Sequence, residues 1–139
     1  AKQLQDSIDQ GATLELGGTH EGCNFAPTLL TGVTNKMTAF KEETFGPLAV
    51  IIEAANEADA IALANETEFG LGAALWTSDL DKAARLAAQI ESGNVFINAM
   101  VRSDARLPFG GVKQSGYGRE LSLEGTHEFL NIKTVYIQQ

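Results

Sequence analysis

The sequence predicts an α/β fold, because strand and helix patterns alternate through the middle of the chain. A compact apolar run rich in β-branched residues, Leu48 to Glu53, predicts a buried strand. Two further strands are predicted at Gly72–Thr77 and at residues 94–98, and a helical pattern precedes each of them. This strand–helix–strand–helix–strand order implies two consecutive βαβ units. We therefore expect a parallel βαβαβ core with helices packed on the sheet.

The two helices of this core have recognisable ends. Asn56 is a predicted N-cap, with two carboxylates in the following turn, and this helix should end before Gly70. Ser78 is the predicted cap of the second helix, which Gly93 should end. The elements expected on either side of the core are, in chain order, a helix that Gly11 can end, a strand at Thr13–Leu16, an irregular loop at 19–26, a glycine-rich loop at 108–118, a helix at 121–130 and a terminal strand at 133–137.

Composition narrows the classes of partner. The 139 residues amount to one ordinary domain or a piece of a larger one. The net charge of −8 makes nucleic acid a poor partner, and no apolar run approaches the roughly 20 residues that a membrane helix needs. The single cysteine, Cys23, cannot form an internal disulfide, which fits a reducing compartment. We expect a cytoplasmic protein that contacts neither nucleic acid nor membrane.

The first candidate site is the loop Lys41–Pro47, which directly precedes the first predicted strand of the core. A carboxylate such as that of Glu43 can accept hydrogen bonds from both hydroxyls of a ribose, and the ring of Phe45, two residues later, can pack on a flat heterocycle. Together these side chains suit a nucleoside. The alternative interpretation is a solvated acidic loop with Phe45 plugged into the core.

The second candidate site is the segment Leu107–Glu120, which contains four glycines and an aromatic residue, Phe109. Glycines at this density permit positive φ and close approach of the backbone. The alternative interpretation is a flexible surface loop, which Phe109 makes less favourable. Gly70 to Leu75 is the nearest approach to a dinucleotide fingerprint, but it leads into a strand and not out of one, so we reject it.

Both segments resemble signatures of the aldehyde dehydrogenase superfamily, Glu-Glu-x-Phe-Gly-Pro and Pro-Phe-Gly-Gly-x-Lys-x-Ser-Gly-x-Gly-Arg-Glu. The resemblance spans essentially the whole chain, as the C-terminal segment of such an enzyme. It implies that Glu43 binds the ribose hydroxyls of the nicotinamide nucleoside of NAD or NADP, and that Phe45 lies against the nicotinamide ring. It also implies that Phe109 lines the substrate channel. Arg119 is interpreted as part of the loop's architecture.

The resemblance also implies a domain organisation. Residues 1–132 would belong to the C-terminal part of the catalytic domain. Residues 133–139 would form an oligomerisation strand that pairs with a neighbouring subunit, so we expect a homo-oligomer.

The stretch from Met100 to Gly111 is similar to that of one class of succinate-semialdehyde dehydrogenases, which use NAD(P)+. Their aldehyde substrate carries a distal carboxylate, which guanidinium and hydroxyl donors suit. Ser103, Arg102 and Arg106 are therefore candidate substrate ligands. The alternative interpretation is that both arginines pair with Asp104 or with other surface acids.

The family's nucleophile is a cysteine in a Gly-Gln-x-Cys context, upstream of the Glu-x-Phe-Gly-Pro signature. Cys23 lacks that context, and a lone loop cysteine is usually inert. We therefore expect the catalytic thiolate and the general base to lie outside these residues, and the chain to be inactive by itself. His20 and His127 lack ligand-like partners, so no metal site is assigned. The alternative function is a non-catalytic interaction or oligomerisation module derived from the same family.

Overall fold

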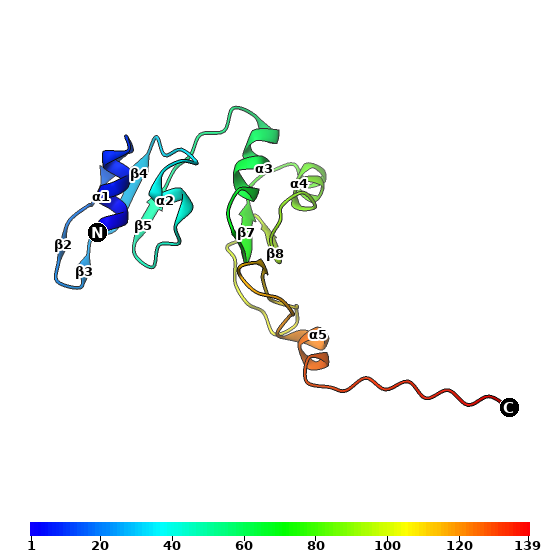
Figure 1. Ribbon diagram of the computed structural model, residues 1–139. Helices are drawn as coiled ribbons and strands as arrows, with labels where there is room; N and C mark the ends of the chain where they lie inside the picture. The colour runs from blue at the N-terminus through cyan, green and yellow to red at the C-terminus, as the bar shows by residue number, and fades with distance from the viewer. The chain divides into compact units, whose positions relative to one another are not determined.

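The computed structural model describes residues 1–139 and divides them into two compact units, Ala1–Thr67 and Glu68–Gln139 (Figure 1). Each unit combines short strands with helices packed beside them. The predicted α/β class is therefore confirmed. Because each unit has its own sheets, the two are described in turn.

The first unit is built around a three-stranded sheet with the order β1-β4-β5. β1 runs antiparallel to β4, and β4 runs parallel to β5. The elements of this unit are α1 (Lys2–Asp9), β1 (Thr13–Leu16), β2 (His20–Glu21), β3 (Asn24–Phe25), β4 (Thr28–Thr31), α2 (Thr38–Lys41), β5 (Leu48–Val50) and α3 (Glu57–Asn65).

The core of the first unit lies where α1 packs on β4 and α2 (Figure 1). Leu30 on β4 is fully buried, and Leu4 of α1 and Met37 are buried around it. Ser7 of α1 is also fully buried, and its hydroxyl accepts a hydrogen bond from the backbone N–H of Ala39 on α2 at 2.9 Å. Apolar burial and this polar contact together fix both helices on the sheet.

The second unit contains the parallel pair β7–β8, with α4 as the crossover between the two strands. Ala83 and Leu86 of α4 are buried, so this helix covers the pair with its apolar face. The predicted βαβ unit is confirmed here. The elements are β6 (Phe69–Gly70), β7 (Gly72–Leu75), α4 (Leu80–Ala87), β8 (Asn94–Ile97), β9 (Val112–Lys113) and α5 (Ser122–His127).

The first of the two predicted βαβ units differs from expectation. β5 pairs with β4, whereas β7 pairs with β8, so β5 and β7 belong to separate sheets. The predicted buried strand at Leu48 to Glu53 is also shorter than expected, since β5 ends at Val50 and Ile51 is exposed. β5 is an edge strand with a single partner, which accounts for its exposure.

Two further expectations in the first unit were wrong or incomplete. Residues 19–26 are not an irregular loop, because β2 and β3 form a hairpin around Gly22 and Cys23, with Gly22 at φ +56°. The sequence also gave no prediction of β4 or of α2. The hairpin depends on a two-residue turn between very short strands, which leave no alternation to detect.

The helix caps were predicted with mixed success. Asn56 is the N-cap of α3, and its side chain accepts a hydrogen bond from the backbone N–H of Asp59 at 3.0 Å, as predicted. Ser78 is not the cap of α4, because Asp79 takes that position and accepts from the backbone N–H of Lys82 at 2.9 Å. The helix therefore begins one residue later than the sequence indicated.

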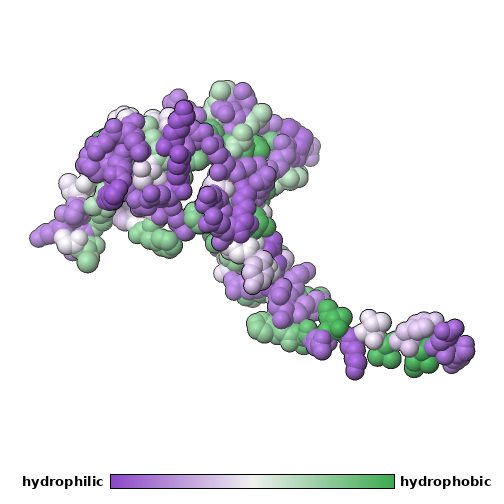
Figure 2. Space-filling view, in the orientation of Figure 1, coloured by the Kyte–Doolittle hydropathy of each residue, from purple (hydrophilic) through white to green (hydrophobic).

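Residues 131–139 form no hydrogen-bonded strand within this chain. Ile132, Val135, Tyr136 and Ile137 are each at least 74% exposed, and Figure 2 shows hydrophobic residues along this C-terminal tail. A strand requires a partner, and the partner expected for this tail is a neighbouring subunit, so the oligomerisation strand stays a prediction. No helix of the chain has the length and apolar character needed to cross a membrane.

Candidate functional site

The carboxyl ends of β7 and β8 lie side by side, since Leu75 and Ile97 are register partners. Asn98, the residue that follows β8, has a φ of +53°, and its side chain binds the backbone of Thr77, two residues beyond the end of β7. Its amide oxygen accepts from the backbone N–H of Thr77, and its amide nitrogen donates to the Thr77 carbonyl, both at 2.8 Å. Loops that leave the carboxyl ends of parallel strands form the usual binding edge of an open α/β sheet. Asn98 therefore anchors the start of the second candidate site.

β8 and the segment that follows it line a pocket of about 370 Å³, which we call the β8 pocket. Arg102, Asp104, Leu107 and Phe109 are among its lining residues. Two of the four predicted substrate residues, Arg102 and Phe109, thus share one cavity. Ser103 and Arg106 do not line it, and both are exposed.

Arg106 is engaged by Asp104 in a two-pronged ion pair. Its Nε donates to Asp104 Oδ1 at 2.9 Å, and its Nη2 donates to Oδ2 at 2.6 Å. The Arg106 backbone N–H also donates to Oδ1 at 3.0 Å, so both carboxylate oxygens are occupied. These hydrogen bonds hold the pKa of Asp104 far below its usual range, and they raise the pKa of Arg106.

Arg102 differs from Arg106 in its surroundings. It forms no ion pair or hydrogen bond, although its charge adds to the lowering of the Asp104 pKa. Of the alternatives that the sequence left open, pairing with Asp104 is therefore observed for Arg106 and not for Arg102.

The glycine-rich segment is an ordered loop. Phe109 and Glu120 exchange two backbone hydrogen bonds of 2.8 Å, which close its base. Arg119 Nη1 donates to the carbonyls of Gly111 at 3.0 Å and Gly118 at 2.6 Å. The architectural role predicted for Arg119 is confirmed, and the alternative of a flexible surface loop does not fit these contacts.

Gly93, directly before β8, supports the same loop by its lack of a side chain. A Cβ on Gly93 would lie 1.8 Å from the Gly110 carbonyl oxygen, a distance that no atom pair tolerates. Only glycine allows the start of β8 and the glycine-rich loop to approach this closely.

The Lys41–Pro47 loop of the first unit presents an aromatic ring and a free carboxylate. Phe45 is 92% exposed and lines a pocket of about 260 Å³, so the interpretation of Phe45 as a core plug was wrong. Glu43 is exposed, and its carboxylate has no hydrogen-bond partner, whereas the neighbouring Glu42 carboxylate accepts from Gln3 Nε2 at 3.1 Å. A free acceptor two residues from an exposed ring fits a ribose diol joined to a flat base.

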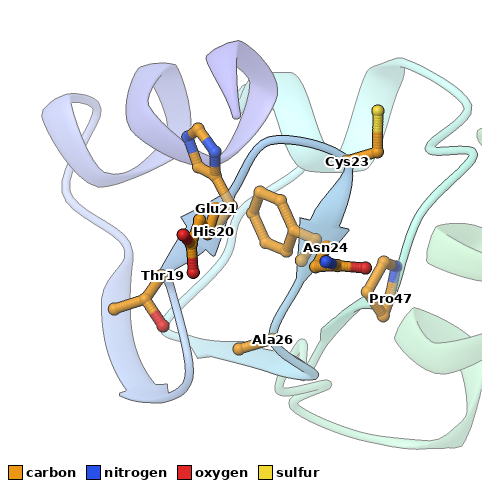
Figure 3. Close-up of a pocket in the computed structure, with 8 residues that line it drawn as sticks. Thr19, His20, Glu21, Cys23, Asn24, Ala26 and Pro47 are labelled. Carbon is orange, nitrogen blue, oxygen red and sulfur yellow. The ribbon is translucent and has the colours of Figure 1, made fainter.

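A cavity of about 740 Å³ lies at the β2–β3 hairpin of the first unit, and none of the predicted site residues line it (Figure 3). The rings of His20 and Phe25 stack across the hairpin with 5.5 Å between their centroids. Cys23 is exposed at the turn, and Figure 3 shows it separated from His20, which lies toward the other end of the hairpin. Cys23 forms no hydrogen bond or ion pair, and that the catalytic cysteine lies outside these residues stays a prediction.

Two residues of the second site were not singled out from the sequence as site residues. Asn98 had a detectable signal, because asparagine tolerates positive φ where a strand turns into a loop. Asp104 was considered only as an alternative partner of the arginines, yet it lines the β8 pocket itself. Its position two residues before Arg106 favours a local ion pair within one turn.

Comparisons with known proteins agree in both sequence and structure. A family model described as the aldehyde dehydrogenase family matches residues 1–135. The succinate semialdehyde dehydrogenase (NAD(P)+) of Escherichia coli is 51% identical over 137 residues, which cover 96% of this chain and 30% of the relative. The succinate-semialdehyde dehydrogenase (NADP(+)) of Deinococcus radiodurans is 52% identical over 136 residues, which cover 96% of this chain and 28% of the relative.

Solved structures contain the same fold. The succinic semialdehyde dehydrogenase of Streptococcus pyogenes, solved in complex with NADP+, has a TM-score of 0.93 and 39% sequence identity. The match covers 99% of this chain and 31% of that protein. The chain thus spans about 30% of the length of the relatives that it matches.

Proposed function

Because the chain belongs to the aldehyde dehydrogenase family, we propose that it is the C-terminal part of an NAD(P)-dependent enzyme that oxidises an aldehyde to a carboxylic acid. The observation that carries the proposal is the pairing of a family match over residues 1–135 with a pocket that holds both Arg102 and Phe109. The length of the relatives supports an activity that belongs to a longer protein, of which these residues are one part.

The first unit would contribute to cofactor binding. The Glu43 carboxylate would accept hydrogen bonds from the ribose hydroxyls next to the nicotinamide, and the exposed Phe45 ring would pack on the nicotinamide face. When bound, NAD or NADP accepts the hydride that leaves the substrate carbon. Glu43 and Phe45 would orient that ring and shield one face of it from water.

The nucleophile would come from another part of the complete enzyme. Cys23 is an exposed thiol at a hairpin turn, without a facing base and outside the family's Gly-Gln-x-Cys context. Thiolate attack on the aldehyde needs a positioned base or a positive neighbourhood, and neither surrounds Cys23. The 139 residues by themselves would therefore bind ligands without catalysing oxidation.

We propose succinate semialdehyde as the substrate, with succinate as the product. Phe109 would form the apolar wall of the channel, and the unpaired guanidinium of Arg102 would meet the distal carboxylate. Ser103 and Arg106, on the same loop, are the other candidate ligands. The E. coli and D. radiodurans relatives carry this activity in their names, which supports the choice of substrate.

The exposed apolar tail supports assembly with a second copy of the chain. Val135 and Ile137 would add to a sheet edge of a neighbouring subunit as residues 133–139 form a strand, giving a homo-oligomer. We place the enzyme in the cytoplasm, since its single cysteine suits a reducing compartment.

The substrate is tested by steady-state kinetics on the complete enzyme that carries this chain. A chimera of the E. coli relative, in which these 139 residues replace the matching segment, serves equally well. We expect kcat/KM for succinate semialdehyde to exceed that for butanal by at least about tenfold, the contribution of one charge-assisted contact. Equal values for the two aldehydes would refute the substrate. A complete protein that oxidises neither aldehyde would instead support a non-catalytic module.

The cofactor role is tested with a matched pair of variants, Glu43→Gln and Glu42→Gln. We expect Glu43→Gln to raise the KM for NAD(P) by about tenfold, because a charged acceptor is lost from the ribose contact. Glu42→Gln should leave this KM nearly unchanged, because the Glu42 carboxylate faces Gln3. The assignment fails if the two variants raise the cofactor KM equally.

A further inference from the structure

We propose that Arg106 acts at the β8 pocket by neutralising Asp104, and that Arg102 is the guanidinium which thereby remains available to a substrate carboxylate. This inference rests on the proposed function and deepens it. It makes Asp104 and Arg106 positioning residues for substrate choice, and it leaves the contact with the substrate to Arg102.

The β8 pocket is lined by one positive and one negative side chain, and the negative one would oppose the binding of an anionic substrate. Arg102 and Asp104 are the only two charged residues among those that line it. The Asp104 side chain is 25% exposed, so its charge is only partly screened by water. A bare carboxylate at this position would repel an anionic substrate and would attract Arg102.

Arg106 is placed to remove that charge without entering the pocket. Its side chain is 86% exposed and does not line the cavity, yet its two prongs and its backbone N–H satisfy both oxygens of Asp104. A two-pronged guanidinium–carboxylate pair is among the stronger and more directional ion pairs at a protein surface. The pair also anchors the turn before Phe109, because the Leu107 backbone N–H donates to the Asp104 carbonyl at 3.0 Å.

Neutralisation by a cation is required because Asp104 cannot be neutralised by a proton under ordinary conditions. An aspartate carboxyl has an ordinary pKa of about 3.9, so Asp104 would remain an anion at neutral pH with or without Arg106. The charge of Arg102 also acts on Asp104, which places the two residues within electrostatic reach of each other. In the absence of Arg106, Arg102 is the cation that Asp104 would recruit.

This role and a direct contact between Arg106 and the substrate predict opposite results for a double variant. If Arg106 binds the substrate carboxylate itself, removing Asp104 as well cannot restore binding. If Arg106 masks Asp104, the Arg106→Ala defect depends on Asp104 and disappears when that residue becomes asparagine. The sign of this coupling is the discriminating observation.

The experiment compares four forms of the complete enzyme or of the chimera described above: unmodified, Arg106→Ala, Asp104→Asn and the double variant. The KM for succinate semialdehyde and the KM for butanal are measured in each. Inhibition of butanal oxidation by succinate is a second measure of carboxylate binding. Arg102→Ala, alone and combined with Asp104→Asn, is the matched control on the same loop.

We expect Arg106→Ala to raise the KM for succinate semialdehyde and the inhibition constant of succinate by about tenfold, the scale of one neighbouring charge. The KM for butanal, which carries no carboxylate, should change much less than the KM for succinate semialdehyde. The double variant should return to within about threefold of the unmodified enzyme, and Arg106→Lys, which keeps the cation, should show an intermediate defect. Arg102→Ala should be impaired with or without Asp104→Asn.

Several outcomes would overturn the inference. A double variant as impaired as Arg106→Ala would make Arg106 a direct ligand, and an unimpaired Arg106→Ala would deny it any role. If Arg106→Ala does not fold, Asp104→Asn distinguishes masking from a purely structural ion pair, because masking predicts unchanged or tighter binding of the carboxylate and a structural pair predicts a loss for both aldehydes. Arg106→Lys then distinguishes masking from a direct contact, because masking predicts that adding Asp104→Asn restores its binding. An unmodified enzyme without preference for succinate semialdehyde would refute the proposed function, independently of these comparisons.

Discussion

The clamp between Asn98 and Thr77 offers the most direct stability test of the second unit. Replacing Asn98 with alanine removes two side-chain hydrogen bonds of 2.8 Å to the Thr77 backbone and leaves a non-glycine residue at φ +53°. Each bond contributes about 0.5–1 kcal/mol, since both are exposed, and the left-handed backbone adds about 1 kcal/mol for alanine. We expect Asn98→Ala to lower the free energy of unfolding by about 2–3 kcal/mol.

Asn98→Gly separates the two contributions. Glycine adopts positive φ without strain, so this variant loses the hydrogen bonds alone and should be destabilised by about 1–2 kcal/mol. Asn131→Ala, in the exposed tail and without hydrogen bonds, is the matched control and should change the free energy of unfolding by less than about 0.5 kcal/mol.

The assay is urea unfolding of the chain followed by the fluorescence of Trp76. This residue is the only tryptophan, it is 66% exposed, and it directly precedes the clamped Thr77. With a slope of about 1 kcal/mol/M, the midpoint should fall by about 2–3 M for Asn98→Ala and by about 1–2 M for Asn98→Gly. The reasoning is refuted if the glycine variant is less stable than the alanine variant, or if Asn98→Ala behaves like Asn131→Ala.

Three further expectations concern packing and charge. Gly93→Ala should disrupt the contact with Gly110, because the new Cβ would lie 1.8 Å from the Gly110 carbonyl oxygen. Amide hydrogen exchange throughout the glycine-rich loop should then accelerate, and unchanged exchange would contradict this prediction. Leu30→Ala, at a fully buried position, should destabilise the first unit by about 3 kcal/mol, against about 1 kcal/mol for Leu14→Ala at 41% exposure, as measured by circular dichroism in urea. Hydrogen bonds from Arg106 lower the pKa of Asp104 in the folded protein. The ion pair therefore stabilises the fold fully at any pH above the ordinary aspartate pKa of about 3.9, and this stabilisation is lost as the pH falls through the lower pKa of the folded state. A carbon chemical-shift titration should therefore find this carboxyl still ionised at about pH 3, and half-protonation there would show the ion pair to be absent.

Local chemistry explains what the sequence predicted correctly. The N-cap at Asn56 depends on a side chain and a backbone N–H only three residues apart, so it can be predicted from a short stretch of sequence without knowledge of distant contacts. The predicted cap of α4 was one residue too early, because Ser78 and Asp79 are both good caps and only the observed hydrogen bond identifies Asp79. The strand–helix–strand pattern of β7, α4 and β8 was predictable from its apolar spacing.

Contacts between distant residues explain what the sequence did not predict. The sheet to which β5 belongs is decided by β4, a strand that carries no alternating pattern. The exposure of Phe45 was equally hidden, because an aromatic residue in a loop suits a core and a binding surface alike. In the second candidate site, the sequence singled out two arginines on the loop that follows β8, and only the hydrogen bonds to Asp104 distinguish the surroundings of Arg106 from those of Arg102.

The extended tail at residues 131–139 also makes the chain sensitive to proteolysis, and this sensitivity depends on whether another strand pairs with the tail. Proteases bind their substrates as exposed, extended backbone. Lys133 lies in such a segment, so trypsin can bind it and cleave the peptide bond that follows it. When another strand pairs with this tail, its backbone hydrogen-bonding groups become occupied and the peptide bond after Lys133 becomes inaccessible. The rate of cleavage at this one bond is therefore a gauge of whether the tail is engaged, and it requires neither an active enzyme nor a bound cofactor.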